Sequence, residues 1–369
     1  MHSFLVKKHV FMTLVLAVLY LLLWLSEVKA AHRIIVMTDS ENNQQIQSAG
    51  FRGVVTGLGM TYEEGTNQYS LTKGYQLELL SYSQRNPLIT LSQADEVIAI
   101  ICQTVSDCRP ALDNTAAKDV LVIASHSSGG DLKGSDNLMR VPASSQMQHL
   151  AIYQKMKQDQ VKNFVVIHEP HTKILQHYNE FLSNYYSDVQ FEQQRPNWVA
   201  SFPLTDQTVL APQQQGMTET TLAQLIPQLQ VDGIVFIGAV ERFQALTQTN
   251  TALTSFAWYI NELPIITGFA NLQMFTPYRP QQDESLAYYT AFDTGAFLKK
   301  VITSYMISNG VAQRKGFLAV ARETVLAKSE AKTGMKTFSN ADTMGSFLIQ
   351  RYDAQGQPAA VEFIEVKAK

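Results

Sequence analysis

The chain is poor in cysteine and has no excess of positive charge. Only 2 of its 369 residues are cysteine, which excludes a scaffold built from several disulfides and a zinc site held by four thiolates. Lysine and arginine number 29 against 32 aspartate and glutamate, for a formal net charge of -3. Proteins that bind nucleic acid usually carry a basic surface, so we expect no nucleic-acid partner.

Motifs for covalent and nucleotide chemistry are also missing. The sequence has no glycine-rich dinucleotide fingerprint, no phosphate-binding loop that ends in Gly-Lys, and no Gly-x-Ser-x-Gly elbow. Ser125-His126-Ser127 places serine beside histidine, but neighbours along a chain do not usually face each other. No pattern positions a general acid against a general base. We therefore expect a protein that is not an enzyme.

One group of histidines invites a metal-binding interpretation. His168-Glu169-Pro170-His171 is followed by His177, but the spacing is not His-Glu-x-x-His, and Pro170 prevents a regular helix across the group. A polar loop at the end of a strand explains these residues more simply. We predict no resident metal and no other cofactor.

The first thirty residues have the three parts of a secretory signal. Two lysines precede an apolar run of about fifteen residues, Phe11 to Leu25, and Val28-Lys29-Ala30 then supplies small residues at a cleavage point. A membrane-spanning helix usually needs roughly twenty apolar residues. We expect residues 1–30 to be removed and the mature protein to lie in the periplasm. The alternative is an uncleaved inner-membrane anchor with the remainder facing the periplasm.

Export would place both cysteines in an oxidising compartment. Cys102 and Cys108 are close in sequence, so a disulfide between them would close a small loop and restrict the unfolded chain only a little. The alternative is two thiols, one buried at a strand end and one exposed.

After residue 30, short apolar runs alternate with stretches of helical periodicity. The predicted strands are Arg33–Thr38, Tyr75–Tyr82, Val97–Ile101, Val120–Ala124, Phe164–Ile167, Ile234–Ile237 and Ile265–Thr267. The predicted helices are 46–62, one that begins at 91–95, 146–159, 173–186, 219–229 and 285–309. Strands that are apolar on both faces belong to sheets covered by helices on both sides. The alternation predicts parallel α/β units with right-handed crossovers, followed by a β-hairpin over 346–352 and 359–366.

Two polar loops follow two of the apolar strands. One begins at Cys102 and contains Ser106 and Asp107, and the other runs from Ser125 to Asp131 with two glycines. Ligands of open α/β sheets bind beyond the carboxyl ends of strands, where hydroxyls and free backbone N–H groups can hold an anion. Ser106, Ser127 and Ser128 would then donate to a ligand carboxylate. The alternative is that these serines cap helices or turn the chain.

The order of short motifs resembles a known family. The stretch from Val97 to Leu132 is similar to type I periplasmic binding proteins of the branched-chain amino-acid-binding (leucine-binding protein-like) group, in which a strand with a serine cluster precedes a strand with an Ala-Ala-Thr loop. The resemblance continues along the chain in Met139–Gln146, Phe164–Pro170, Val231–Gly238, Leu263–Ile266, Phe292-Asp293 and Arg351–Gly356.

The resemblance implies two doubly wound three-layer lobes joined by a three-crossing hinge. The expected first lobe comprises 31–141 and 266–335, the second lobe comprises 142–265, and a C-terminal hairpin, 336–369, returns to the second lobe. A small amino acid, amide or other carboxylate would bind between the lobes. The protein would deliver it to an ABC-type transporter through an inner-membrane permease. The alternative is a periplasmic interaction or sensor protein of the same fold without a transport role.

The resemblance also implies ligand contacts. From the first lobe these are Ser106, Asp107, His126, Ser127 and Ser128, where His126 takes the place of a family alanine. From the second lobe, Lys173 falls near the position of a family tyrosine, and Glu241 is a candidate partner for a ligand ammonium, as are Glu169 and Asp107.

Overall fold

The computed structural model of the protein describes residues 32–39, 44–63, 68–70, 75–82, 97–115, 119–127, 132, 135–170, 172–188, 195–204, 217–261, 269, 271–277, 284–309, 314–338, 340–353, 355 and 358–368. The expected signal peptide, the helix start at 91–95 and the strand at 265–267 lie outside these residues. Within the described part of the chain, no helix combines the length and the apolar character needed to cross a membrane.

One seven-stranded sheet forms the centre of the first lobe. Its strand order is β2-β3-β4-β1-β5-β6-β7. Strands β4, β1, β5, β6 and β7 run parallel, whereas β2 and β3 pair antiparallel at one edge. The strands are β1 (His32–Asp39), β2 (Thr61–Glu63), β3 (Gln68–Ser70), β4 (Tyr75–Tyr82), β5 (Val97–Cys102), β6 (Leu121–Ala124) and β7 (Leu138–Arg140).

Helices cover both faces of this sheet. The helices are α2 (Gln44–Leu58), α4 (Val105–Thr115), α9 (Leu286–Asn309) and α10 (Arg314–Glu323). Ile34 and Ile98 lie in one core cluster with residues of α2, α9 and α10, whereas Ile35 and Ile100 lie in another with residues of α4. Successive strand residues point to opposite faces, so this division places α4 on one face and the other three helices on the other.

A second seven-stranded sheet forms the second lobe, in the order β14-β13-β12-β11-β10-β8-β9. Strands β9, β8, β10, β11 and β12 are parallel, and β13 is antiparallel to both of its neighbours. The strands are β8 (Asn163–His168), β9 (Asn197–Pro203), β10 (Gly233–Ile237), β11 (Ala257–Asn261), β12 (Leu272–Pro277), β13 (Met344–Tyr352) and β14 (Pro358–Lys367).

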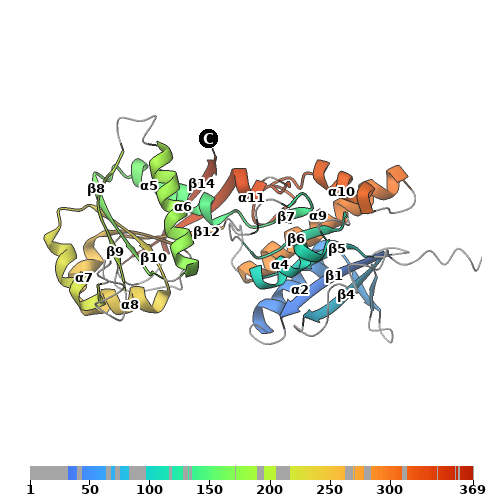
Figure 1. Cartoon of the computed structure of the whole chain (residues 1–369), viewed down its shortest axis with the longest axis horizontal. Coiled ribbons are helices and arrows are strands. Elements are labelled where there is room, and N and C mark those ends of the chain that lie inside the picture. Colours follow the sequence, from blue (N-terminus) through green and yellow to red (C-terminus); the bar gives the residue numbers. More distant parts are fainter. Residues whose placement is uncertain are drawn as a thin grey trace, which may run out of the picture.

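The second sheet is also covered on both faces. Its helices are α5 (Ser145–Gln158), α6 (Thr172–Asp188), α7 (Glu219–Leu225), η3 (Ile226–Gln228), α8 (Val240–Thr249), η4 (Thr251–Ser255) and the short α11 (Asn340–Thr343). Helices α5 and α6 share one core with Phe164 and Val166, and α7 and α8 share the other with Val165 and Ile167. The predicted pair of three-layer α/β lobes is confirmed, and Figure 1 shows them side by side along the long axis.

The chain crosses between the lobes three times. It passes from β7 to α5, from β12 to α9, and from α10 to β13. The second boundary, expected at 265/266, is placed too early, because Leu272–Pro277 pairs with β11 and so belongs to the second sheet. The third boundary, expected at 335/336, is also early. Lys336 exchanges backbone hydrogen bonds with Leu326 next to α10, and the hairpin that returns to the second sheet starts at Met344.

Two of the crossings are bonded to each other. The N–H of Ser144, in the first crossing, donates to the carbonyl of Ala341, in the third, at 2.6 Å. Arg140, at the end of β7, is buried and forms an ion pair with Asp342 of α11. These contacts lie where the lobes join, so they fix the path of the chain at the junction (Figure 1).

Close backbone packing joins the two halves of the first lobe. A Cβ atom at Gly57 of α2 would overlap the carbonyl oxygen of Phe292 in α9, and a Cβ at Gly295 of α9 would overlap the carbonyl oxygen of Val54. Glycine at these positions therefore allows the helices to approach until their backbones touch.

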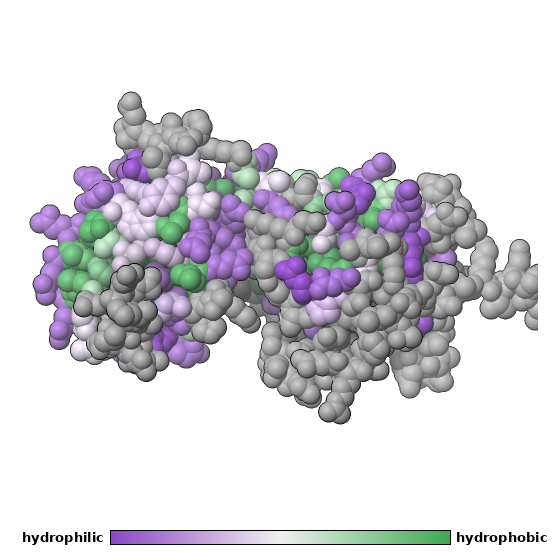
Figure 2. Space-filling view, in the orientation of Figure 1, coloured by the Kyte–Doolittle hydropathy of each residue, from purple (hydrophilic) through white to green (hydrophobic). Residues whose placement is uncertain are grey.

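Apolar residues are mostly inside the two lobes. Figure 2 shows hydrophilic residues spread over the coloured surface of both lobes, with hydrophobic residues in small groups between them. Among the described residues the large apolar side chains that remain exposed are scattered over several elements: Leu175, Tyr186, Val199, Val325, Val361 and Phe363. Scattered residues of this kind are normal on a protein surface.

Candidate functional site

The candidate site lies at the carboxyl edge of the first sheet, where β5 and β6 end together. Cys102 is the register partner of Ala124, and the N–H of Ser125 donates to the carbonyl of Cys102 at 2.9 Å. The segments that follow the two strands therefore leave the sheet side by side. In open α/β sheets this edge is where ligands bind.

Three polar side chains at this edge have buried atoms that lack partners. Gln103 is 2% exposed and Ser127 is 5% exposed, and His126 is half-buried. Across the described residues, no hydrogen bond reaches either polar atom of the Gln103 amide, the Ser127 hydroxyl or Nδ1 of His126. Buried polar groups normally have partners, since leaving one unpaired costs about 1–3 kcal/mol. Three such groups on two adjacent loops make this edge a candidate site for an external ligand.

The position of the Gln103 amide depends on a glycine of α2. A Cβ atom at Gly50 would lie 2.5 Å from Nε2 and 2.8 Å from Oε1 of Gln103. Only glycine leaves room for the amide against this helix. The amide is therefore enclosed between α2 and the ends of the strands, which explains its low exposure.

The three side chains present uncharged hydrogen-bonding groups. Burial lowers the pKa of His126 below its usual value of 6.5, so its imidazole is neutral at neutral pH. A hydroxyl and an amide do not ionise, and together the groups can both donate and accept. This chemistry fits a ligand carboxylate, amide or hydroxyl.

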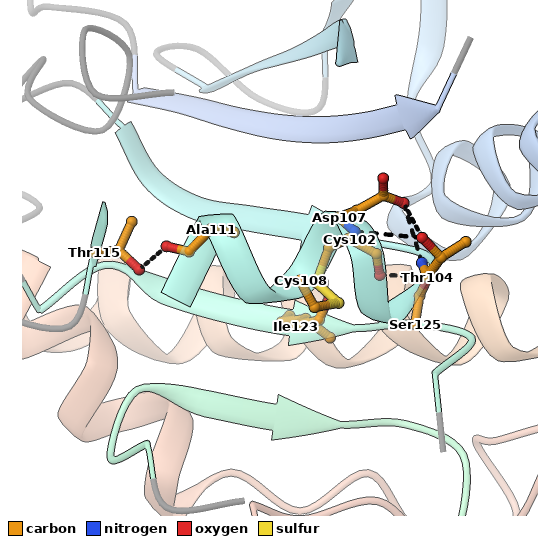
Figure 3. The surroundings of a disulfide bond; sticks show 8 residues. All are labelled: Cys102, Thr104, Asp107, Cys108, Ala111, Thr115, Ile123 and Ser125. Atoms are coloured by element: carbon orange, nitrogen blue, oxygen red, sulfur yellow. Dashed lines mark hydrogen bonds between the residues drawn. A yellow bond between two sulfur atoms is a disulfide. The ribbon is translucent and has the colours of Figure 1, made fainter. Parts of the chain in front are cut away.

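The turn between β5 and α4 is held by a reciprocal helix cap (Figure 3). Oδ2 of Asp107 accepts from the backbone N–H of Thr104 at 3.1 Å and from its hydroxyl at 2.8 Å, and the N–H of Asp107 lies 3.3 Å from the Thr104 hydroxyl oxygen. This is a capping box, with a carboxylate where a helix favours negative charge. The sequence interpretation treated Asp107 as a ligand contact and missed this structural use.

A disulfide crosses the same turn. Cys102, the last residue of β5, is bonded to Cys108 of α4, and both are fully buried (Figure 3). Of the two alternatives that the sequence left open, the structure has the disulfide. The bond and the capping box enclose the segment that contains Gln103, so they fix the backbone from which its side chain extends.

The carboxyl edge of the second sheet contains a different set of polar groups. The ring of His168, at the end of β8, stacks on Tyr178 of α6 with centroids 4.0 Å apart, and the Tyr178 hydroxyl donates to the hydroxyl of Ser201 at 2.9 Å. Oε1 of Glu169 accepts from the backbone N–H of Ala239 at 2.5 Å and so caps α8, whose N-cap alanine has no side-chain acceptor. Glu169, a candidate for an ammonium contact, therefore has a structural role here.

The structure locates some of the expected ligand contacts more fully than others. His126 and Ser127 lie together on the loop after β6, whereas Glu241 is exposed in the first turn of α8. Ser106 lies in α4 and Lys173 in α6, but their side chains, like all of Ser128, are outside the described part. Sequence reasoning missed Gln103. Its signal was its place two residues after the apolar strand predicted at Val97–Ile101, in the same polar loop as Ser106.

Comparison with known proteins supports the fold assignment. No family model matches the sequence, and no curated protein matches it. Among solved structures, an ABC transporter substrate-binding protein of Desulfitobacterium hafniense is 13% identical, covers 90% of this chain and 99% of its own, and superposes with a TM-score of 0.64. A solute-binding protein of R. palustris in complex with 4-hydroxybenzoate is 10% identical, with coverages of 90% and 96% and a TM-score of 0.62.

A leucine-binding protein of Thermotoga maritima is similar to the same extent. It is 14% identical, its alignment covers 91% of this chain and 99% of that one, and its TM-score is 0.60. Nearly complete coverage in both directions means that both lobes and their crossings correspond. At this low identity the likeness concerns the fold, which is that of the type I periplasmic binding proteins.

Proposed function

We propose that the protein is an exported, periplasmic solute-binding protein that closes its two lobes on a small carboxylate- or amide-bearing ligand and delivers it to an ABC-type transporter. One observation carries the proposal. Gln103, His126 and Ser127 place buried, unpartnered polar atoms at the sheet edge where this fold holds its ligands.

The uncharged cluster favours a ligand with its own acceptors. A carboxylate would accept from the Ser127 hydroxyl and from Nε2 of Gln103, which are both without partners among the described residues. Two of the similar structures were solved in complex with a ligand, one with leucine and one with 4-hydroxybenzoate, and each of these ligands carries a carboxylate. In our proposal Ser106 and Ser128 add hydroxyls from the same two turns.

The second lobe would complete the site. Lys173 is the second residue of α6 and Glu241 the second of α8, and both helices begin just after strands that end at the carboxyl edge of the second sheet. We propose that Lys173 contacts an anionic part of the ligand and Glu241 a cationic part. A ligand held from both lobes stabilises the closed arrangement relative to the open one. A micromolar ligand supplies about -8 kcal/mol for binding and closure together.

The test is a panel of small carboxylates and amides that includes leucine and 4-hydroxybenzoate. Each compound is added to the purified mature protein, and the melting temperature and the radius of gyration from small-angle scattering are measured. A ligand should raise the melting temperature and reduce the radius of gyration, and Ser127→Ala should make both changes smaller. If no compound of the panel changes either quantity, ligand-driven closure on a small carboxylate or amide is refuted.

The transport step needs a separate experiment. Crosslinking of the ligand-loaded protein in envelope membranes should capture an inner-membrane permease, and capture should decrease when Ser127→Ala lowers ligand occupancy. Crosslinking to a receptor, or to a permease irrespective of the ligand, would instead support the interaction or sensor alternative.

A further inference from the structure

A second cluster of unpartnered side chains lies on the helices that cover the second sheet. His149 belongs to α5, and His177 and Glu180 belong to α6, which packs against it. One ligand atom from each of the three side chains can be chosen so that all lie within 4.8 Å of one another. The two residues of α6 are three positions apart, so they project from the same face of the helix.

Burial leaves this cluster short of hydrogen bonds. His149 is 0% exposed, and within the described residues neither of its ring nitrogens has a hydrogen-bond partner. Nδ1 of His177 and Oε2 of Glu180 also lack one, and they lie 3.6 Å apart, beyond hydrogen-bond distance. A buried imidazole with both nitrogens unpaired is costly for a fold, so His149 has bonding capacity that the described residues do not use.

The surroundings hold the three side chains in place. The ring of Phe181 packs edge-on against His149 with centroids 6.4 Å apart, and the other carboxylate oxygen of Glu180, Oε1, accepts from Nε2 of Gln176 at 3.2 Å. The second oxygen, Oε2, lies 3.6 Å from Nδ1 of His177. The side chain of His177 is 32% exposed, so the cluster has a route to solvent.

We propose that His149, His177 and Glu180 form a binding site for a divalent transition-metal ion, with Zn²⁺ as the best fit. Two imidazole nitrogens and one carboxylate oxygen are a donor set that Zn²⁺ accepts, and water would fill a fourth position on the exposed side of His177. The donor atoms already lie within 4.8 Å of one another. Small side-chain rotations would shorten these distances to those between the ligand atoms of a tetrahedral site. The ion would then link α5 to α6.

The protonation of the buried histidine is compatible with this role. Burial and, to a smaller extent, the neighbouring His177 lower the pKa of His149 to about 3 against the opposing effect of Glu180, so the imidazole is neutral at neutral pH and offers a lone pair. The cluster lies on helices of the second lobe, away from the strand ends of the first lobe. The inference does not rest on the solute-binding function proposed above, although α6 also carries Lys173.

The experiment measures metal binding by the full mature protein, purified without a histidine tag and stripped with a chelator. Calorimetric titration with Zn²⁺ should give one tight site per chain, and Co²⁺ should give the visible absorption of a tetrahedral complex. Saturation with Zn²⁺ should raise the melting temperature by about 5 °C at a hundredfold excess over the dissociation constant.

Variants of the two residues on α6 identify the ligands. His177→Gln and Glu180→Gln should each weaken Zn²⁺ binding by about tenfold or more and remove the tetrahedral Co²⁺ spectrum. His168→Gln, in the same lobe but outside the cluster, is the matched control and should bind as the unmodified protein does. These residues are preferred to the fully buried His149, whose replacement risks misfolding. The inference is overturned if the unmodified protein shows no stoichiometric site, or if all three variants bind Zn²⁺ equally well.

Discussion

Replacing the Gln103 amide by an apolar side chain of similar size should stabilise the ligand-free protein. Gln103 is 2% exposed and neither polar atom has a partner within the described residues, so the folded state bears an uncompensated desolvation cost. Gln103→Met removes both polar atoms and keeps nearly the same length. We expect the free energy of unfolding to rise by about 1–2 kcal/mol, because an unsatisfied buried group costs about 1–3 kcal/mol.

The matched control is a buried glutamine whose amide nitrogen is bonded to a carboxylate, although its Oε1 has no partner among the described residues. Gln273 is 5% exposed, and its Nε2 donates to Oδ2 of Asp159 at 2.7 Å. Gln273→Met breaks a bond to a charged acceptor and should lower the free energy of unfolding by about 2 kcal/mol. If the Gln103 amide is kept for a ligand, the same substitution should therefore raise the free energy of unfolding at position 103 and lower it at position 273.

Urea unfolding monitored by circular dichroism measures both changes, and the transition of each lobe is fitted separately if the two lobes unfold apart. Gln103→Met should also weaken binding of any ligand found with the panel above. The reasoning is refuted if Gln103→Met lowers the free energy of unfolding as Gln273→Met does, since the amide would then be bonded within the fold.

Three further predictions concern stability. Under oxidising conditions, replacing Cys102 and Cys108 by alanine should lower the free energy of unfolding by about 2 kcal/mol, the chain-entropy value for a short loop, and equal stability of the variant in urea melts would contradict this. Gly57→Ala forces α2 away from a carbonyl of α9 and should cost about 1–3 kcal/mol, whereas an unchanged melting temperature would show that the helices pack less closely. Burial lowers the pKa of His126 and of His168 from 6.5, so the unfolded chain binds more protons than the folded one as the pH falls below that value. The urea midpoint should therefore decrease as the pH is lowered from about 7 to about 5, and this decrease should be smaller in His168→Gln. A midpoint that rises as the pH is lowered would contradict the assignment.

The apolar strands could be read from the sequence because burial on both faces leaves a continuous hydrophobic run. The strands predicted at 97–101, 164–167 and 234–237 correspond to β5, β8 and β10 with ends shifted by no more than one residue. Strand β9, Asn197–Pro203, was missed because it lies at a sheet edge and its residues alternate in burial. Strand β12, Leu272–Pro277, was missed because the run at 265–267 was taken as the strand in this part of the chain.

The site was predictable as a place but only partly as a set of residues. The rule that ligands bind beyond strand ends selected the turns after β5 and β6, and the structure shows that these two strands are neighbours in the sheet. It did not show that Asp107 would bond to Thr104, because a capping box and a ligand contact use the same residue types. It did not select Gln103, because its burial depends on Gly50 of α2, which is distant in sequence. Likewise, His149 and His177 meet only through the packing of α5 against α6.

The most direct test of the account is native mass spectrometry of the protein purified from the cells that express it, beside its Gln103→Met and Ser127→Ala variants. We predict that the unmodified protein retains one small molecule per chain and that both variants lose it. A molecule retained equally by all three proteins would contradict the central claim that the buried polar cluster at the ends of β5 and β6 holds the ligand.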